Sequence, residues 1–234
     1  MTVQGLFVGL ITLDLLYLTE RFPDRNQKIV AMDYAVAAGG PATNAAVTFG
    51  YLGGSAKLLG VLGTHPIREL ILADVRQWGV TIADLHPDRS DPPPTSSILV
   101  TETTGERAVI SLNAVKSQIT ADAMFNVFSD EALNGIDVVL IDGHQMAVGE
   151  TIARQAKARQ IPVVIDGGSW KSGFEAVLPY VDYAVCSANF HPSGCETIDS
   201  VFAYLESFRI PHIAITQGEK PILYRSRGKS GEIT

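Results

Sequence analysis

The sequence predicts an α/β fold built on a doubly wound parallel sheet flanked by helices. In the second half of the chain, segments with helical spacing alternate with short apolar runs, which is the rhythm of repeated βαβ units. Each apolar run ends in a small or polar cluster, as expected at the carboxyl edge of an open sheet. The 234 residues are 46% hydrophobic, enough to bury the core of one α/β domain over residues 1–234.

The expected strands of this sheet are residues 6–11, 54–61, an edge element at 80–85, then 138–141, 163–165, 183–186 and 212–215. The expected helices are 41–52, 66–78, 121–128, 146–159, 174–178 and 197–208. Two pairs of strand-like segments interrupt this order, 15–19 with 28–36 and 95–102 with 107–112. The second pair predicts a hairpin, because a short polar turn containing Gly105 joins its arms.

Composition narrows the class of function. A net charge of −7 argues against a nucleic-acid partner. No apolar run reaches membrane-spanning length, and no charged region precedes a leader-like core, so we expect a cytoplasmic protein. Cys186 and Cys195 have neither metal-ligand nor redox-pair spacing and are expected to be buried, reduced thiols.

The stretch from Gly39 to Gly63 is the most informative part of the chain. Its opening, Gly39-Gly40-Pro41-Ala42-Thr43-Asn44, predicts a glycine turn that leads into a helix, with proline in the first turn. Asn44 is the long polar group of that turn. One interpretation is a local turn and a core helix; the other is a helix N-terminus that binds the hydroxyls of a small polar ligand.

The same stretch resembles the N-terminal signature of the pfkB (ribokinase-like) carbohydrate kinase family. The family pattern of two glycines, a small residue, asparagine, a second small residue and later glycines is filled at Gly39, Gly40, Ala42, Asn44, Ala46, Gly53 and Gly63. The resemblance implies ATP-dependent phosphorylation of a sugar or sugar-like hydroxyl, with Mg²⁺. It also implies a ribokinase-like fold with a small β-sheet lid, here about 15–36 and 95–113, which often forms a homodimer contact.

The resemblance implies a set of sugar-binding residues. These are Asp14, Gly39, Gly40, Asn44, Arg107, Asp142 and Asn113. From the residues alone, Asp14 has an alternative role as a turn or helix-cap residue, because it follows a predicted strand. Two roles remain open for Arg107: a solvated residue of the hairpin, or a side chain that binds hydroxyls or phosphate. His144, two residues after Asp142, is expected to cap a helix.

The resemblance also implies a nucleotide-binding set, formed by Lys171, Ser187, Thr216, Gly218 and Glu219. Lys171 lies in an Asp166-x-x-x-x-Lys loop that is similar to the family's phosphate-proximal loop, although a surface lysine remains the alternative. No residue of this chain is assigned as a metal ligand.

The sequence departs from the family pattern at two places, and the second changes the kinase activity expected of this chain. The Asn-x-x-Glu motif tied to Mg²⁺ is absent, with Ser187 and Phe190 in its place, a variant that resembles the ketohexokinase and sulfofructose kinase side of the family. The segment Asp-Thr-x-Gly-Ala-Gly-Asp, which carries the catalytic base, does not occur. We therefore expect the chain to be a fragment whose base would lie beyond Thr234, with negligible kinase activity alone.

Two other functions remain as alternatives. A non-catalytic sugar- or nucleoside-binding protein could use the same scaffold. A Rossmann-type NAD enzyme is disfavoured, because no Gly-x-Gly-x-x-Gly follows the first strand.

Overall fold

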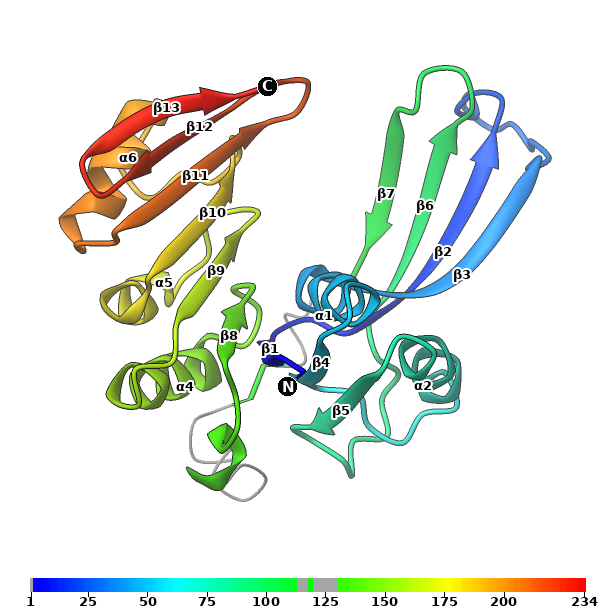
Figure 1. Ribbon diagram of the computed structural model, residues 1–234. Helices are drawn as coiled ribbons and strands as arrows, with labels where there is room; N and C mark the ends of the chain where they lie inside the picture. The colour runs from blue at the N-terminus through cyan, green and yellow to red at the C-terminus, as the bar shows by residue number, and fades with distance from the viewer. Residues whose placement is uncertain (1, 113–117, 120–129) are drawn as a thin grey trace.

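The computed structural model describes residues 2–112, 118–119 and 130–234. Its main sheet has nine strands in the order β13-β12-β11-β10-β9-β8-β1-β4-β5 (Figure 1). The strands from β11 to β5 are all parallel. Their bounds are β1 Gln4–Val8, β4 Ser55–Gly60, β5 Val80–Asp84, β8 Val138–Ile141, β9 Val163–Gly167, β10 Tyr183–Ser187 and β11 His212–Gln217.

The order of the strands fixes where a ligand site can form. From the central β1 the chain builds outward to β4 and β5 on one side, and later through β8 to β11 on the other. The direction of winding therefore reverses between β1 and β8. Ligands of open α/β sheets bind at such a reversal, beyond the carboxyl ends of the strands.

Helices cover the two faces of the sheet, and each face has its own hydrophobic core. Alternate residues of a strand point to opposite faces, so Leu6 and Val8 of β1 belong to one core and Phe7 to the other. Figure 1 shows α4 (Met146–Ala158), α5 (Phe174–Val177) and α6 (Ile198–Ser207) on one side, and α1 (Pro41–Tyr51) and α2 (Arg68–Arg76) on the other. The doubly wound prediction is confirmed.

A second sheet of four strands rises beside α1 and α2, in the order β3-β2-β6-β7 (Figure 1). Its strands are β2 Thr12–Thr19, β3 Asp33–Gly39, β6 Thr95–Thr101 and β7 Arg107–Ser111. We call it the lid sheet. The predicted hairpin is confirmed, because β6 and β7 pair antiparallel, whereas β2 and β6 pair parallel.

Some predicted bounds are wrong in detail. The second lid strand runs from Asp33 to Gly39 rather than over 28–36, so Gly39 ends a strand and Gly40 alone opens the helix. The first core strand ends at Val8, and the chain re-enters a strand at Thr12, which places Asp14 inside β2. The predicted helix at 121–128 lies outside the described residues.

One half of the main sheet has a partly open face. On β8 and β9, Leu140 and Val164 are half-buried and do not belong to the core formed with α4, α5 and α6. Tyr183 and Val185 on β10 are 42% and 45% exposed. Parallel sheets normally bury both faces, so this half-open face is unusual for its strand type.

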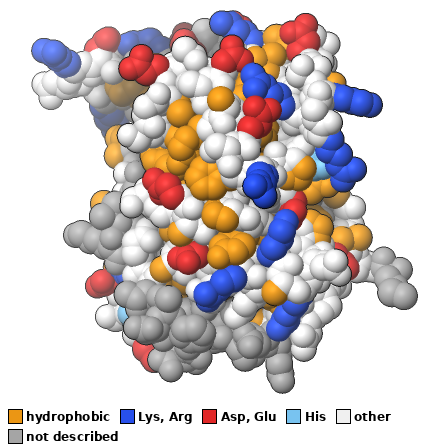
Figure 2. Space-filling model, turned by 90° about the vertical axis from the view of Figure 1, so that its left-hand side faces the viewer, with side chains coloured by type: hydrophobic (Ala, Val, Ile, Leu, Met, Phe, Trp, Pro, Cys, Tyr) orange, Lys and Arg blue, Asp and Glu red, His pale blue; other side chains and the backbone are white. Residues whose placement is uncertain are grey.

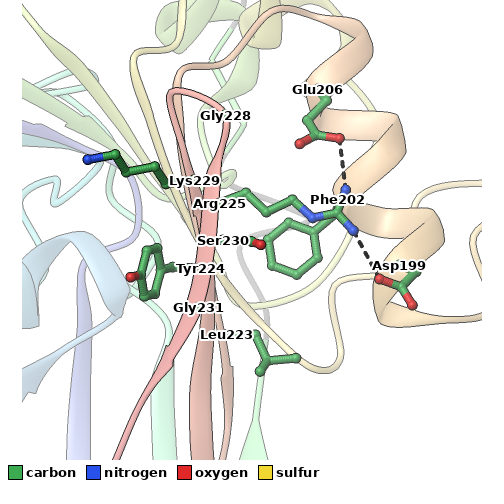
Figure 3. Close-up of a pocket in the computed structure, with 10 residues that line it drawn as sticks. All are labelled: Asp199, Phe202, Glu206, Leu223, Tyr224, Arg225, Gly228, Lys229, Ser230 and Gly231. Atoms are coloured by element: carbon green, nitrogen blue, oxygen red, sulfur yellow. Dashed lines mark hydrogen bonds and ion pairs between the residues drawn. The ribbon is translucent and has the colours of Figure 1, made fainter.

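The antiparallel strands β12 (Lys220–Ser226) and β13 (Lys229–Ile233) extend the sheet and are attached to α6 through Arg225. The Arg225 guanidinium donates to Glu206 Oε2 at 2.9 Å and to Asp199 Oδ1 at 3.0 Å. It also lies 4.5 Å from the centre of the Phe202 ring (Figure 3). The ≈ 470 Å³ hollow around these residues is therefore crossed by a structural ion-pair network.

The surface carries charges of both signs. On the face in Figure 2, basic and acidic side chains are interspersed with small hydrophobic patches. Within the described residues, no helix is long and apolar enough to cross a membrane.

Candidate functional site

A cavity of ≈ 530 Å³ lies between the lid sheet, the N-terminus of α1 and the ends of β1, β8 and β9. It brings together residues that are far apart in the sequence. Six residues of the two predicted binding sets line it: Asp14, Gly40, Asn44, Arg107, Asp142 and Lys171. The cavity therefore stands at the reversal of the sheet, where the strand order predicts a ligand site.

Asp14 enters the cavity from the lid strand β2, in register with Ala37 of β3 and Ser96 of β6. Its Oδ1 accepts a hydrogen bond from Thr12 Oγ1 at 2.8 Å. The carboxylate also packs directly against Gly39, where a Cβ atom would overlap it. Asp14 is thus neither a turn residue nor a helix cap, and Gly39 contributes by leaving room for this carboxylate.

The N-terminus of α1 forms the floor of the cavity beside Asp14. Gly40 is its N-cap residue, with φ at 99°, a conformation that L side chains rarely adopt, and a Cβ there would also meet the Leu10 carbonyl. Asn44 lies in the first turn with an exposed side chain that lines the cavity. Thr43 donates from its Oγ1 to Leu10 O at 2.8 Å, which ties the helix to the end of β1.

Asp142 lies beneath the cavity, and its side chain is 0% exposed. Its Oδ2 accepts from the backbone N–H of Leu10 at 2.9 Å and of Ala42 at 3.0 Å. Its Oδ1 accepts from the backbone N–H of His144 at 2.9 Å. One carboxylate therefore joins the segment after β1, the first turn of α1 and the loop after β8, which are the three segments that shape the cavity.

The lid sheet presents one face to the cavity, and its side chains form rows. Asp14, Ser96 and Ser111 are in register and make a polar row, in which Ser96 Oγ donates to Ser111 Oγ at 3.2 Å. The next row, Leu16, Ile98 and Val109, is apolar. Arg107 pairs with Val100 and is four residues along β7 from Ser111, so it lies roughly 14 Å from the polar row.

Lys171, His144 and Ser169 line the cavity on the side of β8 and β9. The Lys171 ammonium donates to Ser169 O at 3.4 Å and to Ser169 Oγ at 3.2 Å. Burial lowers the pKa of Lys171, although the Asp142 and Asp166 carboxylates oppose that shift. Burial and the Asp142 carboxylate raise the pKa of Asp166, while Lys171 and His144 act in the opposite direction.

The His144 ring is buried and lies against Asp142 without capping a helix. Gln145, not His144, is the N-cap residue of α4. His144 Nδ1 lies 3.2 Å from Asp142 Oδ1, but its direction is poor for a hydrogen bond, and Nδ1 has no hydrogen-bond partner within the described part of the chain. The predicted role of His144 as a cap is therefore wrong, and the ring belongs to the cavity wall.

The rest of the predicted nucleotide set does not line this cavity. Ser187 and Thr216 line a separate, mostly apolar hollow of ≈ 370 Å³ on the half-open face. The Ser187 hydroxyl donates to Gly168 O at 2.7 Å, so it has a structural partner. Gly218 and Glu219 form the exposed turn between β11 and β12. The predicted sugar ligand Asn113 lies outside the described residues.

Sequence reasoning missed Ser96, Ser111, Ser169 and His144. Ser96 and Ser111 lie in predicted strands, but their place beside Asp14 follows only from the pairing of β2, β6 and β7, which the sequence does not show. Among the residues that the structure describes, no group of three or more His, Cys, Asp or Glu side chains could hold a metal ion.

The fold and the cavity define a protein of the ribokinase-like class, with a parallel α/β sheet and a lid over the point where its winding reverses. The sequence pattern of the pfkB family carbohydrate kinases matches residues 5–234, and the chain belongs to that family.

Similar proteins agree with this assignment. The chain is 26% identical over 107 residues to ketohexokinase of Mus musculus, a match that covers 46% of this chain but only 36% of the mouse protein. Ribokinase of Giardia lamblia superposes with a TM-score of 0.79 at 19% identity, covering 99% of this chain and 76% of that one. Ribokinase of Arabidopsis thaliana, complexed with ribose and ATP, gives 0.73 at 18% identity, covering 100% and 78%.

Proposed function

We propose that this chain is the sugar-binding part of a carbohydrate kinase that transfers a phosphoryl group from ATP to a hydroxyl of a sugar or sugar-like molecule. The observation that carries the proposal is the meeting of Asp14, Gly40 and Asn44 in one cavity under the lid sheet. A cavity of ≈ 530 Å³ is within the usual range for small-molecule sites.

The chemistry of the cavity wall suits a polyhydroxylated ligand. A carboxylate accepts hydrogen bonds from two neighbouring hydroxyls, and the Asn44 amide both donates and accepts. The polar row of Asp14, Ser96 and Ser111 can therefore hold the edge of a sugar, while Leu16, Ile98 and Val109 cover its carbon face. In the first turn of α1, the Ala42 N–H donates to Asp142 and the Asn44 N–H to Gly40 O, so the floor offers the Asn44 side chain as its donor.

In the proposed reaction, the chain's residues bind and orient the acceptor hydroxyl and exclude water. Such positioning supplies much of the catalysis in phosphoryl transfer. Asp142 holds the floor in place, since its oxygens already accept three backbone N–H groups. ATP, accompanied by Mg²⁺, supplies the phosphoryl group, and no step assigned to this chain depends on a metal ligand. We assign no general base to the described residues, because the Asp-Thr-x-Gly-Ala-Gly-Asp segment does not occur in this sequence.

The experiment is calorimetric titration of the 234-residue chain with a panel of monosaccharides, with Asp14→Asn and Asn44→Ala as site variants. Asp33→Asn, on the exposed lid strand β3, is the matched control. We expect binding to at least one sugar, a loss of about tenfold or more in each site variant, and no loss in the control. Absence of binding to every sugar would contradict the proposal.

A coupled ADP-release assay addresses the reaction itself. The chain alone should show negligible turnover with ATP and the bound sugar. Robust turnover would show that the base lies within these residues. A longer form that binds the sugar but neither binds nor hydrolyses ATP would instead support the non-catalytic binding protein.

We also propose that the lid sheet mediates a homodimer. Val30, Met32, Tyr34, Val36 and Ile110 belong to the lid segments and are exposed by 43% or more, an apolar grouping typical of an interface. Light scattering after size exclusion should give twice the 25.1 kDa chain mass, and Tyr34→Glu should shift the protein to monomer. A wild-type monomer at micromolar concentration would contradict this assignment.

A further inference from the structure

The loop that follows β9 divides its side chains between the cavity and the hydrophobic core. Ser169 and Lys171 line the cavity under the lid sheet. Trp170 lies between them in the sequence, and its ring packs against the core formed with α4, α5 and α6. The loop is therefore anchored in the core by one residue, while the two neighbours of that residue face the cavity.

Three aromatic rings surround the Trp170 indole, and each comes from a different element. Phe174 of α5 stacks on it, with the ring centres 5.5 Å apart and the planes at 27°. Phe190, in the segment after β10, meets it edge-on at 5.3 Å, and Tyr204 of α6 does so at 5.6 Å. Aromatic pairs at such distances stabilise beyond their buried area. Trp170 thus ties the loop after β9 to two helices and to the neighbouring loop.

The same rings support the backbone at the carboxyl edge of the sheet. Phe174 and Phe190 are 0% and 1% exposed. A Cβ atom on Gly143, in the loop after β8, would overlap the Phe174 ring, and one on Gly167, at the end of β9, would overlap Phe190. The backbone at both positions therefore lies directly on the rings. This part of the cavity wall depends on aromatic packing beneath it.

The hydrogen bonds of the loop after β9 act at its start and within it. The Ser187 hydroxyl donates to the backbone at the start of the loop at 2.7 Å. The Lys171 ammonium donates to Ser169 oxygens and is attracted by the Asp142 and Asp166 carboxylates. A lysine side chain has many rotamers, so the place of its ammonium depends on a fixed backbone. The buried indole ring supplies that constraint.

We propose that Trp170 is a positioning residue of the cavity, which fixes Ser169 and Lys171 in place and thereby sets the affinity for the sugar. This inference rests on the proposed function, because it concerns the same site. Trp170 acts through its two neighbours, without contact to the ligand. A sugar that meets these neighbours changes the surroundings of the indole, so the ring should also report binding by its fluorescence.

The two tryptophans of the chain make the fluorescence test specific. Trp78 packs against the other core and makes an edge-on contact with Tyr51. Trp170 is the single tryptophan in Trp78→Phe, and Trp78 is the single one in Trp170→Phe. The full 234-residue chain is titrated with a panel of monosaccharides that includes ribose, fructose and glucose, and calorimetry gives the affinities. At saturation we expect an emission change in Trp78→Phe and none in Trp170→Phe.

Affinity separates the indole from a general apolar side chain. For the sugar that binds the wild type most tightly, Trp170→Leu should weaken binding by about tenfold, and Trp170→Phe, which keeps a ring, by less than about threefold. The matched control Trp78→Leu removes an indole of the other core and should bind as the wild type does. Urea unfolding of every variant confirms that it is folded under the conditions of the titration.

A comparison of combined variants tests whether Trp170 acts through its neighbours. In a chain that carries Ser169→Ala and Lys171→Met, adding Trp170→Leu should weaken binding by less than about twofold more, because the groups that it positions are gone. In Asn44→Ala, which alters another wall of the cavity, Trp170→Leu should still weaken binding by its full factor of about ten, because independent effects multiply.

Several outcomes would overturn the inference. Wild-type affinity in folded Trp170→Leu would reduce the ring to a stabilising core side chain and leave the proposed function intact. A full further loss in the chain without Ser169 and Lys171 side chains would show that Trp170 does not act through them. If Trp170→Leu does not fold, the fluorescence of Trp78→Phe decides, and unchanged emission at saturation refutes the inference. Failure of every sugar to bind the wild type would contradict the proposed function, and the inference with it.

Discussion

Asp142→Ala tests whether one buried carboxylate holds the cavity together. The substitution removes the acceptor of three backbone N–H groups, those of Leu10, Ala42 and His144, from a position with no solvent exposure of the side chain. An alanine methyl group can accept none of these bonds. The three segments that shape the cavity would then lose their common partner.

The expected loss of stability follows from these contacts. A buried N–H group left without an acceptor costs about 1–3 kcal/mol, so three such groups give a range of about 3–9 kcal/mol. Water from the adjacent cavity can enter the space and restore some of the bonds. We therefore expect the free energy of unfolding to fall by about 3–5 kcal/mol, a large part of the total for most domains. Asp142→Asn keeps one acceptor oxygen and should lose about half as much.

Asp84 is the matched control, because its carboxylate also accepts three backbone N–H groups, from Leu62, Gly63 and His86. Asp84 is only half-buried, so water can replace the lost carboxylate, and Asp84→Ala should cost about 1–2 kcal/mol. Urea unfolding followed by circular dichroism, with equal slopes for all variants, gives the comparison. Equal losses for the two alanine variants would refute the reasoning that burial of the carboxylate sets the cost.

Three further predictions concern other contacts. Gly39→Ala should push the Asp14 carboxylate aside, since the added Cβ overlaps it; we expect at least a tenfold loss of sugar affinity with little change in melting temperature, and normal binding would contradict this. Arg225→Met should cost about 1–2 kcal/mol in urea unfolding, because it removes two charged hydrogen bonds at a partly exposed site; an unchanged midpoint would show that the network is not stabilising. Because the pKa of Asp166 is raised from 3.8, its contribution to stability is complete below that pH and is lost as pH rises through the folded-state pKa. Asp166→Asn should therefore have a higher free energy of unfolding than the wild type at pH 7, and this difference should narrow toward pH 4. A difference that widens as the pH falls would contradict the raised pKa of Asp166.

Much of the main sheet was predictable from the sequence. Its strands are short, continuous apolar runs, and the helices between them bury one face and show helical spacing of apolar residues. Both patterns can be recognised without a structure. The role of the glycine pair was predictable in part. A turn before a helix was expected, and Gly40 has the required positive φ, but the need for Gly39 comes from the Asp14 carboxylate, a contact between strands that no local pattern shows.

The lid was harder to predict, because strand pairing rather than composition sets its bounds. Val30 and Met32 suggested a strand from residue 28, yet they are 82% and 54% exposed, and the strand begins at Asp33, where pairing with Leu18 starts. Asp14 was expected after a strand, but the apolar run from Leu6 to Ile11 hides the break between β1 and β2. Lys171 could not be grouped with Asp14 before the order of the strands was known.

The half-open face of β8 to β10 has a practical consequence for each stability measurement. Dyes that fluoresce on contact with apolar surface should adsorb to Tyr183 and Val185 in the native protein, so their signal begins high and rises little on heating. Circular dichroism, which reports the backbone, avoids that background. The same exposed apolar side chains would favour self-association during purification. Mild detergent or low protein concentration should therefore give sharper and more reproducible melting curves.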